Sequence, residues 1–347
     1  MRRLTVFAPG RVNLIGEHTD YNGGLCLPFA IDRGLTITAE CVDVAEIEVH
    51  ACDIGAHDRF SLEAIAPVPG WRTYVRGVAS ELLSAGHALH GTRLEIRSEL
   101  PAGGGLASSA ALTIASALAL LETAGRAPPE PLVLARLCAR VENEWAGAET
   151  GLLDQLAILC ARPGHAVRID TAGESGEAAM EPVPLVLGNW TLCLLDSGAR
   201  HAHADGGYNE RRAECREACA LLGVDSLSEA QPRDVARLPP PLDRRARHVL
   251  TENSRVERMV DALQRSDLSG VGMLLDEGHA SLRDDYEVSV LAVEEAVARL
   301  QAAGARGARM VGGGFGGHVL GLFAPGAAPP PGAVPVYPGG PAAITGL

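Results

Sequence analysis

The amino-acid sequence contains no lysine, so all 30 of its basic residues are arginines. This absence excludes three kinds of site that depend on an ammonium group: the Walker A phosphate loop, the strand lysine of protein kinases and a Schiff base with a carbonyl substrate. Any phosphate group that the protein binds is therefore held by backbone N–H groups, by arginine or by a metal ion.

The sequence also lacks an excess of positive charge, since 43 acidic residues outnumber the 30 basic ones and the formal net charge is −13. A chain with this balance has no broad positive surface for nucleic acid or for an anionic membrane. We therefore expect small molecules as its partners, with no nucleic acid and no membrane.

Cysteine is sparse: the eight cysteines never form a Cys-x-x-Cys pair, and most lie within apolar runs. They are typical of free, reduced thiols. Residues 1–3 are followed by a short strand-like run rather than by the apolar core of an export signal. In residues 100–121 the apolar part is only about 15 residues long, which is too short to span a bilayer. These observations predict a cytoplasmic protein.

The 347 residues, 47% of them hydrophobic, correspond to about two domains of ordinary size. Strand-like runs fill the first quarter, at residues 4–7, 25–31, 35–41 and 47–52. Apolar periodicity predicts helices after Gly105, from Pro131, and over most of residues 208–300. Further strands are expected at residues 166–169, 190–195 and 319–323. Because strands and helices are mixed rather than strictly alternating, we predict two α+β domains, 1–185 and 186–347.

A glycine loop, Gly103-Gly104-Gly105, directly precedes a predicted helix that begins near Ser108 and Ser109. Glycines let the backbone approach an anion, while the free N–H groups and the dipole of the helix start attract it. The pattern indicates a phosphate site. The alternative is an ordinary turn in which Ser108 caps the helix.

Polar side chains crowd residues 8–24, which combine arginine, glutamate, histidine, aspartate and two asparagines with hairpin-type turn residues. Several donors and acceptors at fixed positions suit a ligand that carries many hydroxyl groups. The alternative is a solvated loop.

Asp154 lies inside an apolar stretch that continues to Leu159. A buried aspartate is paired or takes part in chemistry, although capping a helix is its commoner role. Residues 312–317 contain the pattern G-x-G-x-x-G, but no helix pattern and no ribose-binding acid follow it. We therefore do not interpret it as a dinucleotide site.

Together these segments resemble the GHMP small-molecule kinases and, within them, the galactokinases. Residues 8–24 resemble the galactokinase signature, residues 103–110 (Gly-Gly-Gly-Leu-Ala-Ser-Ser-Ala) the ATP-phosphate loop, and residues 312–317 the third motif of the family. Further similarity at residues 196–215, 247–255 and 279–289 extends the resemblance over nearly the whole chain. The resemblance implies a two-domain α+β fold with the active site between the domains, and phosphorylation of D-galactose at its C1 hydroxyl with ATP and Mg²⁺.

The resemblance also implies individual roles for site residues. Asp154 matches the catalytic carboxylate, and Arg11 lies beside it. The positions that match sugar-binding residues are Glu17, His18, Asp20, Gly151 and Tyr208. The positions that match nucleotide-binding residues are Gly103, Gly104, Gly105, Leu106, Ala107, Ser108, Ser109 and Trp71. Ser109 and Glu142 match the groups around Mg²⁺.

Three positions depart from the usual galactokinase pattern: Ala107 replaces serine, Leu153 replaces methionine and His318 replaces cysteine. Arg11 stands where mevalonate kinases have lysine, which favours the sugar branch.

Two alternatives stay open: a sister kinase for L-arabinose or an N-acetylhexosamine, and a catalytically silent galactose and ATP sensor. The intact phosphate loop argues against the sensor. We expect a monomer.

Overall fold

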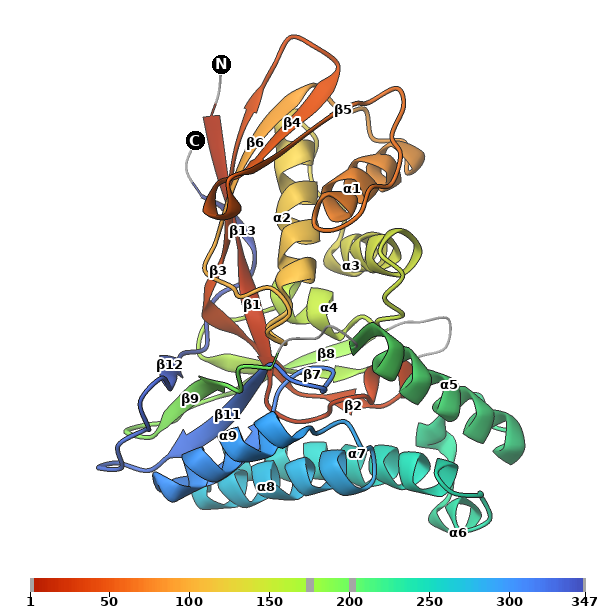
Figure 1. Ribbon diagram of the computed structural model, residues 1–347, viewed down its shortest axis with the longest axis vertical. Helices are drawn as coiled ribbons and strands as arrows, with labels where there is room; N and C mark the ends of the chain where they lie inside the picture. The colour runs from red at the N-terminus through yellow and green to blue at the C-terminus, as the bar shows by residue number, and fades with distance from the viewer. Residues whose placement is uncertain (1–2, 173–177, 200–203, 346–347) are drawn as a thin grey trace.

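A six-stranded sheet forms one side of the molecule in the computed structural model, which describes residues 3–172, 178–199 and 204–345 (Figure 1). Its strand order is β13-β1-β3-β6-β4-β5, and its neighbours are antiparallel except for the parallel pair β4 and β6. The strands are β1 (Arg3–Asn13), β3 (Pro28–Cys41), β4 (Glu46–Ala51), β5 (Ala56–Ser61), β6 (Thr92–Ser98) and β13 (Ala343–Thr345).

Helix α2 (Ser108–Thr123) covers this sheet and packs on β1 and β3 (Figure 1). Residues 110–121 are all buried, because the other helices of this half enclose α2. An Ala- and Leu-rich helix that is apolar on every side is stable only in such a position. The surrounding helices are α1 (Arg72–Ser84), α3 (Pro131–Arg140) and α4 (Leu153–Leu159). One π-helical turn, Val141–Trp145, follows α3 directly.

A four-stranded sheet of order β10-β11-β9-β12 belongs to the second half of the chain. Its strands are β9 (Thr191–Asp196), β10 (Ala305–Met310), β11 (His318–Phe323) and β12 (Val334–Val336). Helices α8 and α9 pack against it, and α7 packs on α8 (Figure 1). The helices of this half are α5 (Ala204–Leu222), α6 (Pro232–Val235), α7 (Leu242–Gln264), α8 (Leu268–Asp284) and α9 (Leu291–Ala302).

A small third sheet joins β2 (Leu25–Cys26), β7 (His165–Asp170) and β8 (Ala179–Pro184). Short 3₁₀ turns occur at η1 (Asp20–Asn22), η2 (Cys52–Ile54) and η5 (Leu227–Glu229). The main hydrophobic core begins with β1 and continues through α2 to residues of α7, α8 and β11. One core therefore connects the two halves of the chain.

The prediction of a mixed α+β fold is confirmed, as are the predicted strands at 166–169, 190–195 and 319–323. The predicted strands at 25–31 and 35–41 are wrong as two separate elements, because residues 28–41 form the single strand β3. Gly34 makes this possible, since a Cβ at that position would lie 2.3 Å from the Ala8 carbonyl oxygen of β1.

The elements that were not predicted from the sequence are the strands β5, β6, β8, β10, β12 and β13 and the helices α1 and α4. Strand β13 pairs with β1, so the C-terminal end of the chain returns to the first sheet. The predicted domain boundary after residue 185 falls in the loop between β8 and β9 and stays a prediction.

The eight cysteines are free, as predicted, and each lies in the described part of the chain. Among the described residues, no helix has both the length and the apolar character needed to cross a membrane.

Candidate active site

A single cavity of about 1090 Å³ brings together the N-terminal polar segment, the glycine loop, Asp154 and the third glycine-rich segment. Both halves of the chain line it, since Tyr208 and residues 312–314 face residues of the first half. All the residues predicted for the site line this cavity except Gly104, Leu106 and Glu142.

Arg11 and Asp154 form an ion pair within this cavity. Arg11 follows an irregularity in β1, and Asp154 lies in the first turn of α4. The Arg11 Nε and Nη2 atoms lie 2.7 and 2.5 Å from Asp154 Oδ1. Arg11 Nη1 also donates to the Gly105 carbonyl at 2.6 Å. One guanidinium therefore connects the carboxylate to the glycine loop.

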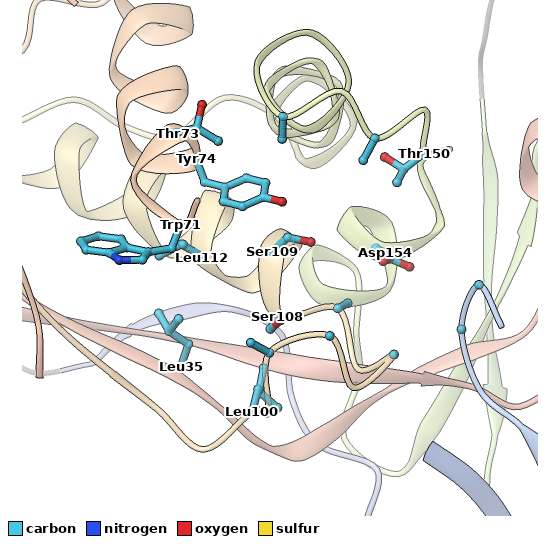
Figure 2. A pocket seen from close by; sticks show the side chains of 18 of the residues that line it. Leu35, Trp71, Thr73, Tyr74, Leu100, Ser108, Ser109, Leu112, Thr150 and Asp154 are labelled. Carbon is cyan, nitrogen blue, oxygen red and sulfur yellow. The ribbon is translucent and has the colours of Figure 1, made fainter. Parts of the chain in front are cut away.

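The glycine loop adopts backbone conformations that favour glycine, with φ of 66° at Gly103 and 77° at Gly105. Ala107, with φ of 59°, is the N-cap of α2, and its methyl side chain makes no hydrogen bond to the first amides of this helix. The alternative of Ser108 as the N-cap is therefore wrong, because Ser108 is the first residue of the helix. The uncapped start of α2 opens into the cavity beside Ser108 and Ser109 (Figure 2).

Gly104 and Leu106 fasten the glycine loop rather than line the cavity. The Leu106 side chain lies in the core, and its carbonyl accepts from the Arg11 N–H at 3.2 Å. The Gly104 carbonyl accepts from the His318 N–H at 3.2 Å and lies 2.6 Å from His318 Nδ1. His318 thus gives the loop a side-chain hydrogen bond from β11.

Glu17 joins the N-terminal polar segment to the third glycine-rich segment. Its Oε1 accepts from the Gly312 N–H at 2.8 Å, and its Oε2 accepts from Asn13 Nδ2. Burial raises the pKa of Glu17 to about 7, although the charge of Arg309 acts in the opposite direction. The buried Arg309 Nη2 lies 3.6 Å from Glu17 Oε2 and 3.5 Å from Glu252 Oε1. This buried charge cluster was not predicted from the sequence.

Asp20 and Gly151 meet at the cavity wall. A Cβ on residue 151 would lie 1.9 Å from Asp20 Oδ2, so only glycine leaves room for this carboxylate. Burial, and then the negative charge of Asp154, raises the pKa of Asp20 to about 6. Tyr208 reaches the same wall from α5 and lies against Gly313.

Glu142 lies behind the cavity on the π-helical turn and is 2% exposed. Thr150 Oγ1 donates to its Oε2 at 3.2 Å, whereas its Oε1 is buried and makes no regular hydrogen bond to any described residue. Burial, and then the charge of Asp154, raises the pKa of Glu142 to about 7. The Ser109 hydroxyl lies close enough to oppose this rise.

The end of the cavity away from Asp154 is apolar. Trp71 and Tyr74 approach it from the start of α1, and Leu35, Leu100 and Leu112 lie around it (Figure 2). Of these five residues, only Trp71 was predicted from the sequence as a site residue. The others come from separate elements and carry no local signal of a binding site.

Three family models match the chain. The galactokinase galactose-binding signature matches residues 2–40, the N-terminal domain of GHMP kinases matches residues 73–162, and the C-terminal domain of GHMP kinases matches residues 259–330. The first of these segments contains Arg11 and Glu17, and the second contains the glycine loop and Asp154.

Curated relatives and solved structures agree with these matches. A galactokinase of Streptomyces coelicolor is 41% identical over 90% of this chain and 82% of its own length. A galactokinase of Thermotoga neapolitana is 39% identical over 93% and 90% of the two chains. The structure of Lactococcus lactis galactokinase complexed with galactose has a TM-score of 0.89 at 30% identity, covering 99% of this chain and 95% of that one. A Methanococcus jannaschii mevalonate kinase shares the fold, with a TM-score of 0.69 at 18% identity. The chain belongs to the galactokinase family of the GHMP kinases.

Proposed function

We propose that this protein transfers the γ-phosphoryl group of ATP to the C1 hydroxyl of D-galactose, releasing galactose 1-phosphate and ADP. The observation that carries this proposal is the Arg11–Asp154 pair, which lies where the glycine loop meets the N-terminal polar segment in one cavity. The curated galactokinases and the galactose complex of the Lactococcus relative support it.

The sugar occupies the polar end of the cavity in this proposal. Glu17, His18, Asp20, Gly151 and Tyr208 line that end. Hydrogen bonds within the protein hold the side chains of Glu17 and His18, which lets them discriminate between hydroxyl configurations. A sugar that lacks the matching hydroxyl leaves a buried polar group unpaired, and this loss discriminates strongly.

Asp154 and Arg11 act at the junction of the two substrates. Phosphoryl transfer has a loose transition state, so most of the rate comes from alignment and from neutralisation of charge. Asp154 orients the C1 hydroxyl and accepts its proton as the bond from the sugar oxygen to phosphorus forms and the bond to ADP breaks. Arg11 holds the carboxylate in place and adds positive charge beside the glycine loop.

The residues around Glu142 fit a magnesium ion. Mg²⁺ prefers oxygen ligands and is commonly held by one or two carboxylates together with substrate phosphates. The buried Oε1 of Glu142, without a regular hydrogen bond among the described residues, and the Ser109 hydroxyl offer such oxygens. When bound, the ion would neutralise charge on the phosphates. Nowhere in the described part of the chain do three His, Cys, Asp or Glu side chains form a metal cluster.

The apolar end of the cavity takes the adenine in this proposal, with Trp71 against the base and the amides at the start of α2 near the phosphates. We further propose that residues 1–185 and 186–347 are the two domains on either side of the cavity. The protein is proposed to act as a monomer in the cytoplasm.

An ADP-release assay with a panel of sugars tests the proposal. We expect turnover with D-galactose and a loss of more than about a hundredfold in kcat/KM with D-glucose, its 4-epimer. Preference for L-arabinose or for an N-acetylhexosamine would identify a sister kinase instead. Binding of galactose and ATP without ADP release would contradict the proposed reaction and indicate a sensor.

A further inference from the structure

A row of three hydrogen bonds runs from His18 into the second half of the chain. His18 Nδ1 lies 2.8 Å from Tyr21 Oη, which lies 2.9 Å from Tyr286 Oη, which in turn lies 3.1 Å from Cys215 Sγ. We call Tyr21, Tyr286 and Cys215 the hydroxyl relay. Its members come from η1, from the segment after α8, and from α5.

Aromatic packing holds this row in place. The His18 ring centroid lies 4.6 Å from that of Tyr286 and 5.4 Å from that of Tyr208. The His248 ring centroid lies 4.5 Å from that of Tyr286. Tyr286 and Cys215 are buried and Tyr21 is partly buried. The two tyrosine hydroxyls and the Cys215 thiol therefore have few alternative partners.

The second ring nitrogen of His18 faces the cavity. This Nε2 is buried and makes no hydrogen bond of ideal geometry to the described residues, although the Gly313 carbonyl lies near the ring and His18 lines the sugar end. The backbone of His18 is left-handed, with φ of 63°, an uncommon conformation for a non-glycine residue. Burial lowers the pKa of His18 to about 3, so its imidazole is neutral at physiological pH.

A neutral imidazole has one N–H donor and one acceptor nitrogen, and a proton on Nδ1 makes Nε2 the acceptor. If the relay donates towards His18, from Cys215 through both tyrosines, Nε2 carries the proton. If it runs in the opposite order, Nε2 accepts. The direction of the relay therefore decides whether His18 donates to a sugar hydroxyl or accepts from one.

We propose that the hydroxyl relay fixes a single tautomer and ring orientation of His18, so that Tyr21 and Tyr286 are positioning residues for sugar recognition. The proposal rests on the proposed function in one respect, that His18 contacts the sugar. It goes beyond that function because neither tyrosine belongs to the predicted set of site residues, and Tyr21, Cys215 and Tyr286 all lie outside the cavity lining.

Substitution of tyrosine by phenylalanine separates the effect of the hydroxyl from that of the ring, since the ring packing is kept and only the hydrogen bonds of the hydroxyl are lost. We expect Tyr21→Phe to raise the KM for galactose about tenfold, and Tyr286→Phe about threefold, with the KM for ATP within about twofold of the wild type. Cys215→Ala has a smaller effect, which Cys215→Ser reverses because serine retains a donor and an acceptor. Tyr337→Phe, at a tyrosine that is 56% exposed, is the matched control.

A second measurement reports the tautomer of His18 directly and does not depend on enzyme activity. The ¹⁵N chemical shifts of the two His18 ring nitrogens, assigned by comparison with His18→Gln, differ between the tautomers. We expect one tautomer in the wild type and in Tyr337→Phe. Tyr21→Phe should show exchange between tautomers or the opposite one.

The proposal is overturned if Tyr21→Phe leaves both the ¹⁵N shifts and the KM for galactose unchanged, or if it raises both KM values equally. If Tyr21→Phe does not fold, Tyr286→Phe and the Cys215 pair are judged by the same two readouts. Failure of the proposed function is distinguishable, because the wild type would then release no ADP with galactose while the ¹⁵N shifts still report on the relay.

Discussion

The two ends of the cavity are built in different ways. At the sugar end, buried side chains such as Glu17 and His18 are fixed by partners from the second half of the chain. At the nucleotide end, the glycine loop offers main-chain amides, and apolar side chains such as Trp71 surround the remaining space. The first end depends on particular side chains in particular protonation states, whereas the second depends mainly on the path of the backbone. In the proposed function, this difference lets a chain without lysine hold a nucleotide.

The largest expected effect is at Asp154, where the two ends meet. Asp154→Asn should lower kcat by about a thousandfold, because the amide cannot take the proton of the C1 hydroxyl, while both KM values change little. Steady-state ADP release measures this. Asp170→Asn, at a surface carboxylate that accepts from the Ala172 N–H, is the control. A kcat near that of the wild type would remove Asp154 from the proposed mechanism.

The cost of burying side chains at the sugar end is measurable as pH-dependent stability. The pKa of Glu17 is about 7 in the folded protein against an ordinary 4.5. The folded state therefore retains a proton that the unfolded state has lost, and stability falls as pH rises from about 4.5 to about 7. Over this interval the free energy of unfolding should fall by about 3 kcal/mol more in the wild type than in Glu17→Gln.

Urea unfolding at a series of pH values tests this expectation. Glu63→Gln, at an exposed glutamate, should follow the wild type. Parallel curves for the wild type and Glu17→Gln would show that Glu17 titrates normally and that the sugar end carries no such cost.

A backbone change should affect the nucleotide end selectively. Gly105 has φ of +77°, and a Cβ there would lie 2.6 Å from the Val311 carbonyl oxygen. Gly105→Ala should raise the KM for ATP about thirtyfold, corresponding to about 2 kcal/mol, and leave galactose binding by calorimetry within about threefold. Gly125→Ala has a similar φ of +66° but no neighbour within 4 Å, so it shares only the backbone strain. Equal kinetic effects in the two variants would contradict this view of the loop.

The smallest expected effect is at the apolar wall. Trp71→Ala should raise the KM for ATP about fivefold, because it removes one aromatic face from the base. Trp71→Phe should recover most of the loss, and Trp190→Ala, outside the cavity, should leave this KM unchanged. A larger change in the KM for galactose than in that for ATP would place the adenine elsewhere.

Local sequence patterns predicted the parts of the site that depend on neighbouring residues. The glycine loop and the helix after it were predictable because loop and helix are contiguous. The sequence could not show that Gly103 and Gly105 line the cavity whereas Gly104 and Leu106 do not. Hydrogen bonds to Arg11 and His318 decide which groups of the loop face the cavity. Tyr286 and Arg309 were missed because their partners, Tyr21 and Glu17, lie more than 250 residues away in sequence.

The sequence by itself determined that any phosphate group must be held without lysine and that a helix follows Gly105, because composition and periodicity act over a few turns. Only the tertiary structure decided that Arg11 meets Asp154 across 143 residues and that Glu17 has a raised pKa. It also decided that the last strand returns to the first. Burial and electrostatic interaction depend on distance in space, and that distance is set only when both halves of the chain pack on one core.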